Sequence, residues 1–214
     1  MPFKRGDHIC AIYSTTEELT REVARFLAEG LRNRERSWYV GSGDEMDSLG
    51  DALRKLGIDV AAETKRKALQ LISGDAAYVV HGTFNPEATI QIFNDAIEQA
   101  YTDGFTGFRA AAEMSWALDC TDGPHQVIVY EALLKSLFSN CRAIGFCLYD
   151  RKRMPLEVIN GALLTHPVAG SHGRYSANRF YDPTIAGLTR SDPAEVLGKL
   201  AHFDRSIGPP SKIS

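Results

Sequence analysis

Apolar residues recur along this chain in two alternating patterns: short runs of the strand type, and stripes with the three-to-four-residue spacing of a helix. The first run, residues 8–13, precedes a helix in which Thr15 and Glu18 stand at capping-box spacing. Later runs predict strands at 37–41, 69–72, 108–114 and 143–149, and the stripes predict helices beginning near Asp44, Asn85, Gln126 and Pro155. Residues 166–182 indicate extended edge structure, and Ser191 with Pro193 predicts a last helix to about His202.

Strands that alternate with helices along the whole chain predict an α/β fold with a mainly parallel sheet and helices on both faces. The run AIGFCLY at 143–149 is almost continuously apolar, which suits a central strand covered on both sides. Gly41-Ser42-Gly43 favours a turn with Asp44 as the cap of the next helix over a phosphate-binding loop.

The composition argues against nucleic-acid-binding, secreted and membrane proteins. The chain has 214 residues, 24 Lys and Arg against 27 Asp and Glu, and a net charge of -3, so we expect one globular unit that does not bind nucleic acid directly. Its first residues lack the apolar core of a signal peptide, and no stretch approaches the roughly 18 apolar residues of a membrane span. We therefore expect a cytoplasmic protein without membrane contact, whose four scattered cysteines (Cys10, Cys120, Cys141 and Cys147) are reduced thiols.

Ligands of open parallel sheets bind beyond the carboxyl ends of the strands, so residues just after each strand are the candidates for chemistry. The first strand is followed by Tyr13-Ser14-Thr15-Thr16-Glu17-Glu18, which lacks the glycines and the lysine of a phosphate-binding loop. Two carboxylates at a helix N-terminus would repel an anion. The sequence therefore argues against ATP hydrolysis at a Walker-type site.

Glu113 ends an apolar strand, where burial would raise its pKa toward the range of an acid or base. No second carboxylate or histidine stands at a fixed local spacing from it. A cap for the following helix and an ion-pair partner for Arg109 are therefore the favoured roles. Met114 and Trp116 predict one apolar wall of a pocket beside it.

His8 and Cys10 stand two residues apart on one strand, and Cys147 and Tyr149 repeat this spacing on another, so each pair shares a face. If the two strands are neighbours, His8, Cys10 and Cys147 converge. Such a group indicates either a metal or haem site, or a hydrogen-bonded core histidine with two buried thiols. His166 and His172 are expected at the surface.

Several short blocks resemble a known family when taken in order. They are Gly6-Asp7-His8-Ile9-Cys10 with Tyr13, Tyr39-Val40, Gly57-Ile58-Asp59-Val60, Glu113-Met114-Ser115-Trp116-Ala117-Leu118, Tyr130-Glu131, Cys147-Leu148-Tyr149-Asp150-Arg151 and Thr165-His166-Pro167. The series, over about residues 5–182, resembles the MEDS domain, a sensory domain of methanogens and methylotrophs first recognised in a regulator of dichloromethane dehalogenation. The resemblance implies a RecA-like, KaiC-like three-layer core without a nucleotide-binding loop. It also implies sensing of small organic, hydrocarbon-like ligands.

We therefore expect residues 1–182 to form a sensory domain and 183–214 to form a C-terminal helix with a flexible tail. The domain is expected to bind a small organic ligand without catalysis, cofactor or metal, with 166–182 as the moving part, and to act on a signalling protein partner. The expected ligand-binding residues are His8, Cys10, Tyr13, Glu113, Met114, Trp116, Tyr149 and Asp150.

Two alternative functions stay open. One is a protein-interaction module that regulates a kinase or sigma-factor pathway through the mildly basic residues 151–214. The other is metal or haem binding through His8, Cys10 and Cys147. The sequence does not decide whether the chain forms a homo-oligomer.

Overall fold

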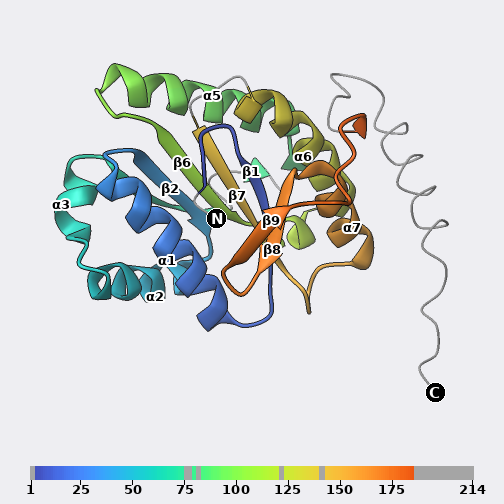
Figure 1. Ribbon diagram of the computed structural model, residues 1–214, viewed down its shortest axis with the longest axis horizontal. Coiled ribbons are helices and arrows are strands. Elements are labelled where there is room, and N and C mark those ends of the chain that lie inside the picture. Colours follow the sequence, from blue (N-terminus) through green and yellow to red (C-terminus); the bar gives the residue numbers. More distant parts are fainter. Residues whose placement is uncertain (1–2, 75–78, 81–82, 121–122, 140–142, 186–214) are drawn as a thin grey trace.

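The computed structural model describes residues 3–74, 79–80, 83–120, 123–139 and 143–185, and the following concerns those residues (Figure 1). In chain order its elements are β1 (His8–Tyr13), α1 (Thr16–Arg32), β2 (Arg36–Gly41), α2 (Gly43–Lys55), α3 (Val60–Lys65), β3 (Leu69–Ser73), β4 (Val79–Val80), β5 (Thr83–Phe84), α5 (Pro86–Thr102), β6 (Phe108–Glu113), the 3-10 helix η1 (Met114–Asp119), α6 (Gly123–Ser139), β7 (Ala143–Asp150), α7 (Leu156–Thr165), β8 (Val168–Ser171) and β9 (Arg174–Ala177).

Seven strands form one sheet in the order β3-β2-β6-β7-β1-β8-β9. All neighbours are parallel except the pair β8 and β9, which is antiparallel. The predicted α/β class with a mainly parallel sheet is confirmed. β7 lies in the middle of the sheet and is buried along nearly its whole length, as its apolar run predicted.

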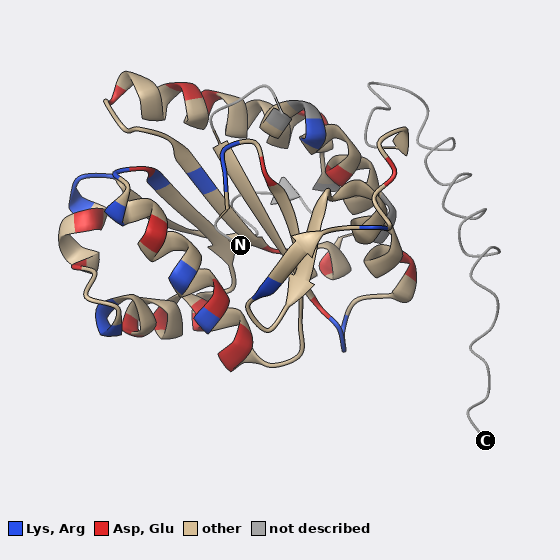
Figure 2. Cartoon of the chain, in the orientation of Figure 1, with Lys and Arg blue, Asp and Glu red and all other residues tan. Residues whose placement is uncertain are grey.

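The two faces of the sheet carry different helices, which gives three layers (Figure 1). On one face, α1 and α2 bury apolar residues such as Leu27 and Leu53 against the alternate strand residues Ile9, Ala11 and Phe146. On the other face, α5, α6 and α7 cover the opposite residues of the same strands, Cys10 and Cys147 among them. Charged residues gather on the helices and loops, and the strands are mainly uncharged (Figure 2).

Capping residues fix where the helices begin. Thr15 accepts the backbone N–H of Glu18, as its spacing predicted. The prediction that Asp44 caps α2 is wrong, because Ser42 is the N-cap residue and the Glu45 carboxylate accepts the Ser42 N–H at 2.8 Å. Asp44 lies in the first turn of the helix instead.

The expected extended structure within 166–182 is confirmed as the hairpin of β8 and β9. Its two-residue turn consists of His172 and Gly173, both with positive φ, of 51° and 73°. A turn of this hand matches the twist of the two strands. Arg174 pairs with Ser171 directly across it.

Four elements were not predicted: the short helix α3, the 3-10 helix η1, and the two-residue strands β4 and β5. The predicted helix from Ser191 to His202, most of the 183–214 segment and Cys141 lie outside the described residues. Among the helices that the structure describes, none combines the length and apolar character needed to cross a membrane.

Candidate functional site

A small polar cavity lies at the carboxyl end of the sheet, and we call it the carboxyl-edge cavity. Its volume is about 270 Å³. Two of the eight expected ligand-binding residues, Glu113 and Trp116, line it. The full lining is Gly41, Ser42, Gly43, Glu45, Ser73, Gly74, Glu113, Ser115, Trp116, Asp119 and Arg153. A cavity therefore lies at the expected end of the sheet. Its lining is largely polar, whereas apolar walls were expected.

Glu113 is held from two sides. The Tyr13 hydroxyl donates to Glu113 Oε1 at 2.9 Å, and the Ser115 N–H and hydroxyl donate to the two carboxylate oxygens at 2.9 and 2.8 Å. Glu113 therefore caps η1, and that predicted role is confirmed. Arg109 is not its partner, because Arg109 pairs with Glu35 and Glu29.

Negative charge dominates this end of the sheet. Burial, with the Glu45 carboxylate, raises the pKa of Glu113 despite the opposing hydrogen bonds from Ser115 and Tyr13. Burial and the neighbouring carboxylates also raise the pKa values of Tyr13 and Tyr39, so both phenols stay protonated and donate. An anion such as phosphate would meet mostly carboxylates here, which agrees with the missing phosphate-binding loop.

Replacing Glu113 with glutamine should change how folding stability depends on pH. Because the folded-state pKa of Glu113 is raised, ionisation of its carboxylate costs stability as the pH rises from the ordinary value of 4.5 through the raised pKa. Glutamine does not ionise. The free energy of unfolding of Glu113→Gln, relative to that of the wild type, should therefore increase as the pH rises through this range. Urea denaturation at a series of pH values measures the difference, and a difference that stays constant with pH would contradict the assignment.

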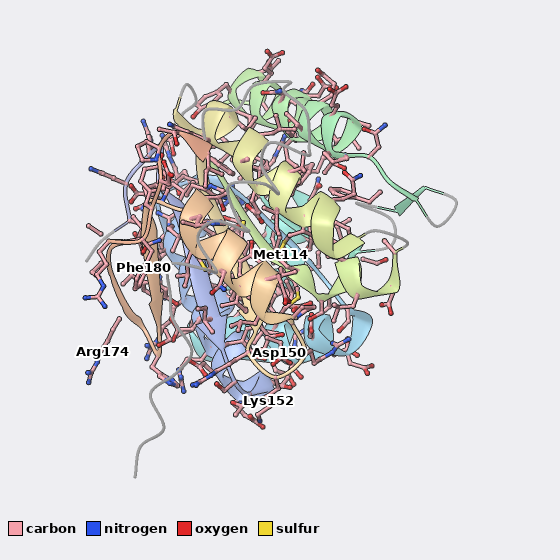
Figure 3. All side chains as sticks on the ribbon, turned by 90° about the vertical axis from the view of Figure 1, so that its right-hand side faces the viewer. Met114, Asp150, Lys152, Arg174 and Phe180 are labelled. Atoms are coloured by element: carbon pink, nitrogen blue, oxygen red, sulfur yellow. The ribbon has the colours of Figure 1, made fainter. Side chains whose placement is uncertain are left out.

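Met114 and Asp150 are not part of the lining of the carboxyl-edge cavity. Met114 is fully buried at the start of η1, in the interior of Figure 3, and packs in the core on the α5–α7 side. Asp150 ends β7, and its carboxylate accepts the N–H of Lys152 at 2.8 Å; both are labelled at one end of the sheet in Figure 3. Their contact with a ligand stays a prediction.

A second group of chemically active side chains lies inside the molecule, on the face covered by α6 and α7. We call it the His–Glu–Cys cluster; it consists of His8 on β1, Glu131 on α6, Cys147 on β7 and His166 at the end of α7. These four side chains are between 0% and 4% exposed. One candidate ligand atom from each lies within 4.8 Å of every other.

Glu131 is the centre of this cluster. Its Oε2 lies 3.1 Å from His8 Nε2 and 3.3 Å from His166 Nε2, and the two imidazole rings are only 3.8 Å apart. Its Oε1 accepts the Tyr149 hydroxyl at 2.6 Å. Cys147 Sγ lies 3.5 Å from His8 Nε2. The expected residues His8 and Tyr149 therefore meet around Glu131, and neither of them lines the carboxyl-edge cavity.

The protonation states of the cluster follow from its burial. Burial, with a contribution from His166, lowers the pKa of His8 to about 4, so this ring is neutral. Burial opposes ionisation of Glu131, but the contacts with His166 and His8 outweigh it and lower the pKa of the carboxyl. Burial raises the pKa values of the Cys147 thiol and the Tyr149 phenol. The Glu131 carboxylate thus lies beside a neutral imidazole, a thiol and a phenol in the interior.

The expected triad of His8, Cys10 and Cys147 forms only in part. Cys10 and Cys147 are register partners on neighbouring strands, and both are buried free thiols. Cys10, whose pKa burial also raises, is not one of the four clustered residues. Glu131 and His166 take part instead.

The prediction that His166 lies at the surface is wrong. The residue follows the last turn of α7, and its ring turns inward so that Nδ1 lies 2.7 Å from the carbonyl oxygen of Ala162. His172, in the hairpin turn, is exposed as predicted. The sequence signal for Glu131 was that it is the single acidic residue of a mainly apolar helix.

The described residues enclose a larger cavity, which lies between α7, the β8–β9 hairpin and the end of β1. We call it the hairpin cavity, and its volume is about 650 Å³. None of the eight expected ligand-binding residues lines it. Its lining is Ile12, Ser14, Arg151, Met154, Leu156, Ile159, Leu163, Ala169, Gly170, Ser171, His172, Ser176, Ala177, Asn178, Arg179 and Phe180.

The strand order, the parallel register and the three layers define a three-layer α/β fold with a mainly parallel sheet. Among solved structures, a KaiC-like protein of the hyperthermophilic archaeon Pyrococcus horikoshii OT3 is similar, with a TM-score of 0.53 and 12% sequence identity. The similarity covers 79% of this chain and 72% of the archaeal one. Comparison with curated protein sequences finds no match.

The chain belongs to the MEDS family. The family model, described as the methanogen/methylotroph DcmR sensory domain, matches residues 7–167. This match confirms the family resemblance and gives the protein a sensory or regulatory role. It spans the strands and helices that form both the carboxyl-edge cavity and the His–Glu–Cys cluster.

Proposed function

We propose that this sensory domain binds a small, mainly apolar organic molecule in the hairpin cavity and does not convert it chemically. Family membership supports the sensory role, and the size and lining of the hairpin cavity support the place and the class of ligand. Cavities of several hundred Å³ with apolar walls and a few polar groups are typical of small-molecule sites.

Apolar side chains from two elements and from the segment after β9 line this cavity. Ile12 comes from β1, Ile159 and Leu163 come from α7, and Phe180 follows β9 with 41% of its surface exposed. Each 100 Å² of apolar surface that ligand and wall bury contributes about 2.5 kcal/mol. After the cost of association, a ligand of a few carbon atoms is expected to bind in the millimolar to micromolar range.

The carboxyl-edge cavity is less suited to such a ligand, because it is smaller and lined by the carboxyl groups of Glu45, Glu113 and Asp119. An apolar molecule would remove water from these carboxyl groups without offering them a hydrogen bond, and this desolvation opposes binding. The hairpin cavity carries no carboxylate in its lining.

The β8–β9 hairpin is the element we propose to move on binding. It forms one wall of the hairpin cavity, and β9 pairs with β8 alone among the described strands. On its other side it contacts α1, where the His172 N–H donates to Glu18 and the Tyr175 hydroxyl donates to Glu22, both at 3.0 Å. A ligand that favours one hairpin position shifts its population, and α1 is placed to pass that change to a signalling partner.

Filling the hairpin cavity should abolish ligand binding. The probes are dichloromethane, 1-bromobutane, 1-hexanol and toluene, followed by ligand-observed NMR on the full chain. We expect at least one to bind the wild type, and Ile159→Trp to weaken that binding at least tenfold because the indole takes up the space of the probe. Hydrogen exchange should slow in β8, β9 and the start of α1 when the probe is bound.

Ile92→Trp is the matched control, because Ile92 is 50% exposed on α5 and does not line the cavity. It should bind the probe as the wild type does. Binding that is equal in the wild type and Ile159→Trp, or no binding by any probe, would refute the assignment of the site. Probe signals that decay into product signals would refute the absence of catalysis.

A further inference from the structure

The His–Glu–Cys cluster has the composition of a metal site rather than of a plain hydrogen-bonded core. It offers two imidazole nitrogens, one carboxylate oxygen and one sulfur, a donor set that zinc accepts in proteins. Four elements contribute one ligand atom each, so binding would tie β1, β7, α6 and the end of α7 together. All four residues are buried.

The orientation of His166 is the observation that carries this inference furthest. A carbonyl oxygen only accepts, so the 2.7 Å contact with Ala162 places a proton on His166 Nδ1. The other nitrogen of the ring is Nε2. That atom is buried without a hydrogen-bond partner among the described residues, yet it lies 3.3 Å from Glu131 Oε2. A cation between these two atoms would satisfy both of them, and a metal ion can take that place.

His8 shows the complementary feature. Its Nε2 faces both Glu131 Oε2 and Cys147 Sγ, whereas its buried Nδ1 has no hydrogen-bond partner among the described residues. Protein hydrogen bonds therefore do not satisfy both nitrogens of the ring. A metal ion at Nε2 would take the place of the proton that this nitrogen otherwise donates to Glu131 Oε2.

Four of the six distances between the proposed ligand atoms are close to those around a tetrahedral ion, and all four residues offer a ligand atom within 4.8 Å of the others. Bonds of about 2.0–2.1 Å from zinc to nitrogen or oxygen, and of about 2.3 Å to sulfur, place neighbouring ligand atoms roughly 3.3–3.6 Å apart. The observed separations are 3.1 and 3.3 Å from Glu131 Oε2 to the two histidines, 3.5 Å from Cys147 Sγ to His8 Nε2 and 3.7 Å from Cys147 Sγ to Glu131 Oε2.

We propose that His8 Nε2, His166 Nε2, Glu131 Oε2 and Cys147 Sγ bind one Zn²⁺ ion as a closed, structural site. Cys147 releases its thiol proton to solvent when the ion binds, so that a thiolate and a carboxylate balance the charge of the ion. Four protein ligands leave no position open for a substrate, which makes the site structural and not catalytic.

Two neighbouring groups hold the ligands in place from outside. The Tyr149 hydroxyl donates to Glu131 Oε1 at 2.6 Å and leaves Oε2 for the metal. The Ala162 carbonyl fixes the tautomer of His166, a common arrangement around ligating histidines. This inference does not rest on the hairpin cavity, and either proposal can fail without the other.

Metal analysis of the wild-type chain, purified without chelators, is the first test. Elemental analysis should find about one zinc per chain, and removal of the ion with EDTA should lower the melting temperature, which added Zn²⁺ restores. Replacement by Co²⁺ should produce tetrahedral d–d absorption together with a near-ultraviolet thiolate-to-cobalt band. A chain that takes up no zinc, gives no thiolate band and melts alike with EDTA and with Zn²⁺ has the hydrogen-bonded core instead, and the proposal is then wrong.

Matched variants identify the ligands. Cys147→Ser should lose the thiolate-to-cobalt band, whereas Cys10→Ser, on the neighbouring strand, should keep it. The opposite result would assign the sulfur ligand to Cys10 and overturn the proposed set. Tyr149→Phe should weaken zinc binding about 10- to 100-fold without removing the band, as expected of a residue that positions a ligand. Unchanged zinc affinity in Tyr149→Phe would contradict its positioning role.

Discussion

Replacing Arg109 with methionine is expected to destabilise the folded protein by about 3–5 kcal/mol, as measured by urea denaturation. Arg109 lies on β6 with 1% of its surface exposed. Its guanidinium pairs with the buried Glu35 carboxylate, contacts Glu29 at 3.2 Å and donates to the Phe26 carbonyl oxygen at 3.3 Å. Methionine fills similar space but leaves the carboxylate of Glu35 buried without its cation.

A double variant separates charge from packing. Arg109→Met combined with Glu35→Leu removes both charges and should recover much of the lost stability, because the stranded carboxylate is the main cost. Arg54→Met is the surface control, since Arg54 and Asp51 form an exposed pair on α2 that is worth less than about 1 kcal/mol. An Arg109→Met protein that is as stable as Arg54→Met would show that the buried pair contributes little.

Gly170→Ala is expected to disrupt the β8–β9 hairpin. A Cβ atom at Gly170 would lie 1.9 Å from the backbone carbonyl oxygen of Arg174, and backbone cannot move aside as a flexible side chain can. We expect a loss at or beyond the upper end of the usual 1–3 kcal/mol for overpacking. Hydrogen exchange should rise across the hairpin, and ligand binding in the hairpin cavity should fall, because Gly170 is part of its wall.

Gly43→Ala is the control for this substitution. Gly43 begins α2, and a Cβ atom there would contact nothing within 4 Å. Alanine reduces the conformational freedom of the unfolded chain, so stability should stay equal or increase by up to about 1 kcal/mol. Equal stability of Gly170→Ala and wild type would mean that the hairpin has another arrangement in solution.

The main strands and the fold class were predictable, because parallel strands buried on both faces leave continuous apolar runs such as 143–149. The short helix α3 was not, since none of its residues is buried and so it has no apolar stripe. The 3-10 helix η1 depends on the Glu113 side chain that caps it, a contact that spacing alone does not specify.

The sequence predicted part of the carboxyl-edge cavity, part of the His–Glu–Cys cluster and none of the hairpin cavity. The strand-end rule brought Glu113 and Trp116 to one cavity, because carboxyl ends of parallel strands meet at one edge. Residue spacing predicted that His8 and Cys147 lie on one face of the sheet. Which helical residues lie over that face depends on the packing of α6 and α7. Glu131 and His166 enter through this packing, and the hairpin cavity arises from the fold-back of β9, which local patterns do not encode.

The place of β1 in the sheet has a consequence for synthesis of the chain. β1 leaves the ribosome well before its two neighbours in the sheet, β7 and β8, with Cys10 opposite Cys147 and Ala169. Both of its edges therefore wait for strands that are made much later, and such distant pairing slows folding. Nascent β1 is thus a segment that chaperones would shield, and mutations that delay its pairing should reduce yield more than they reduce final stability.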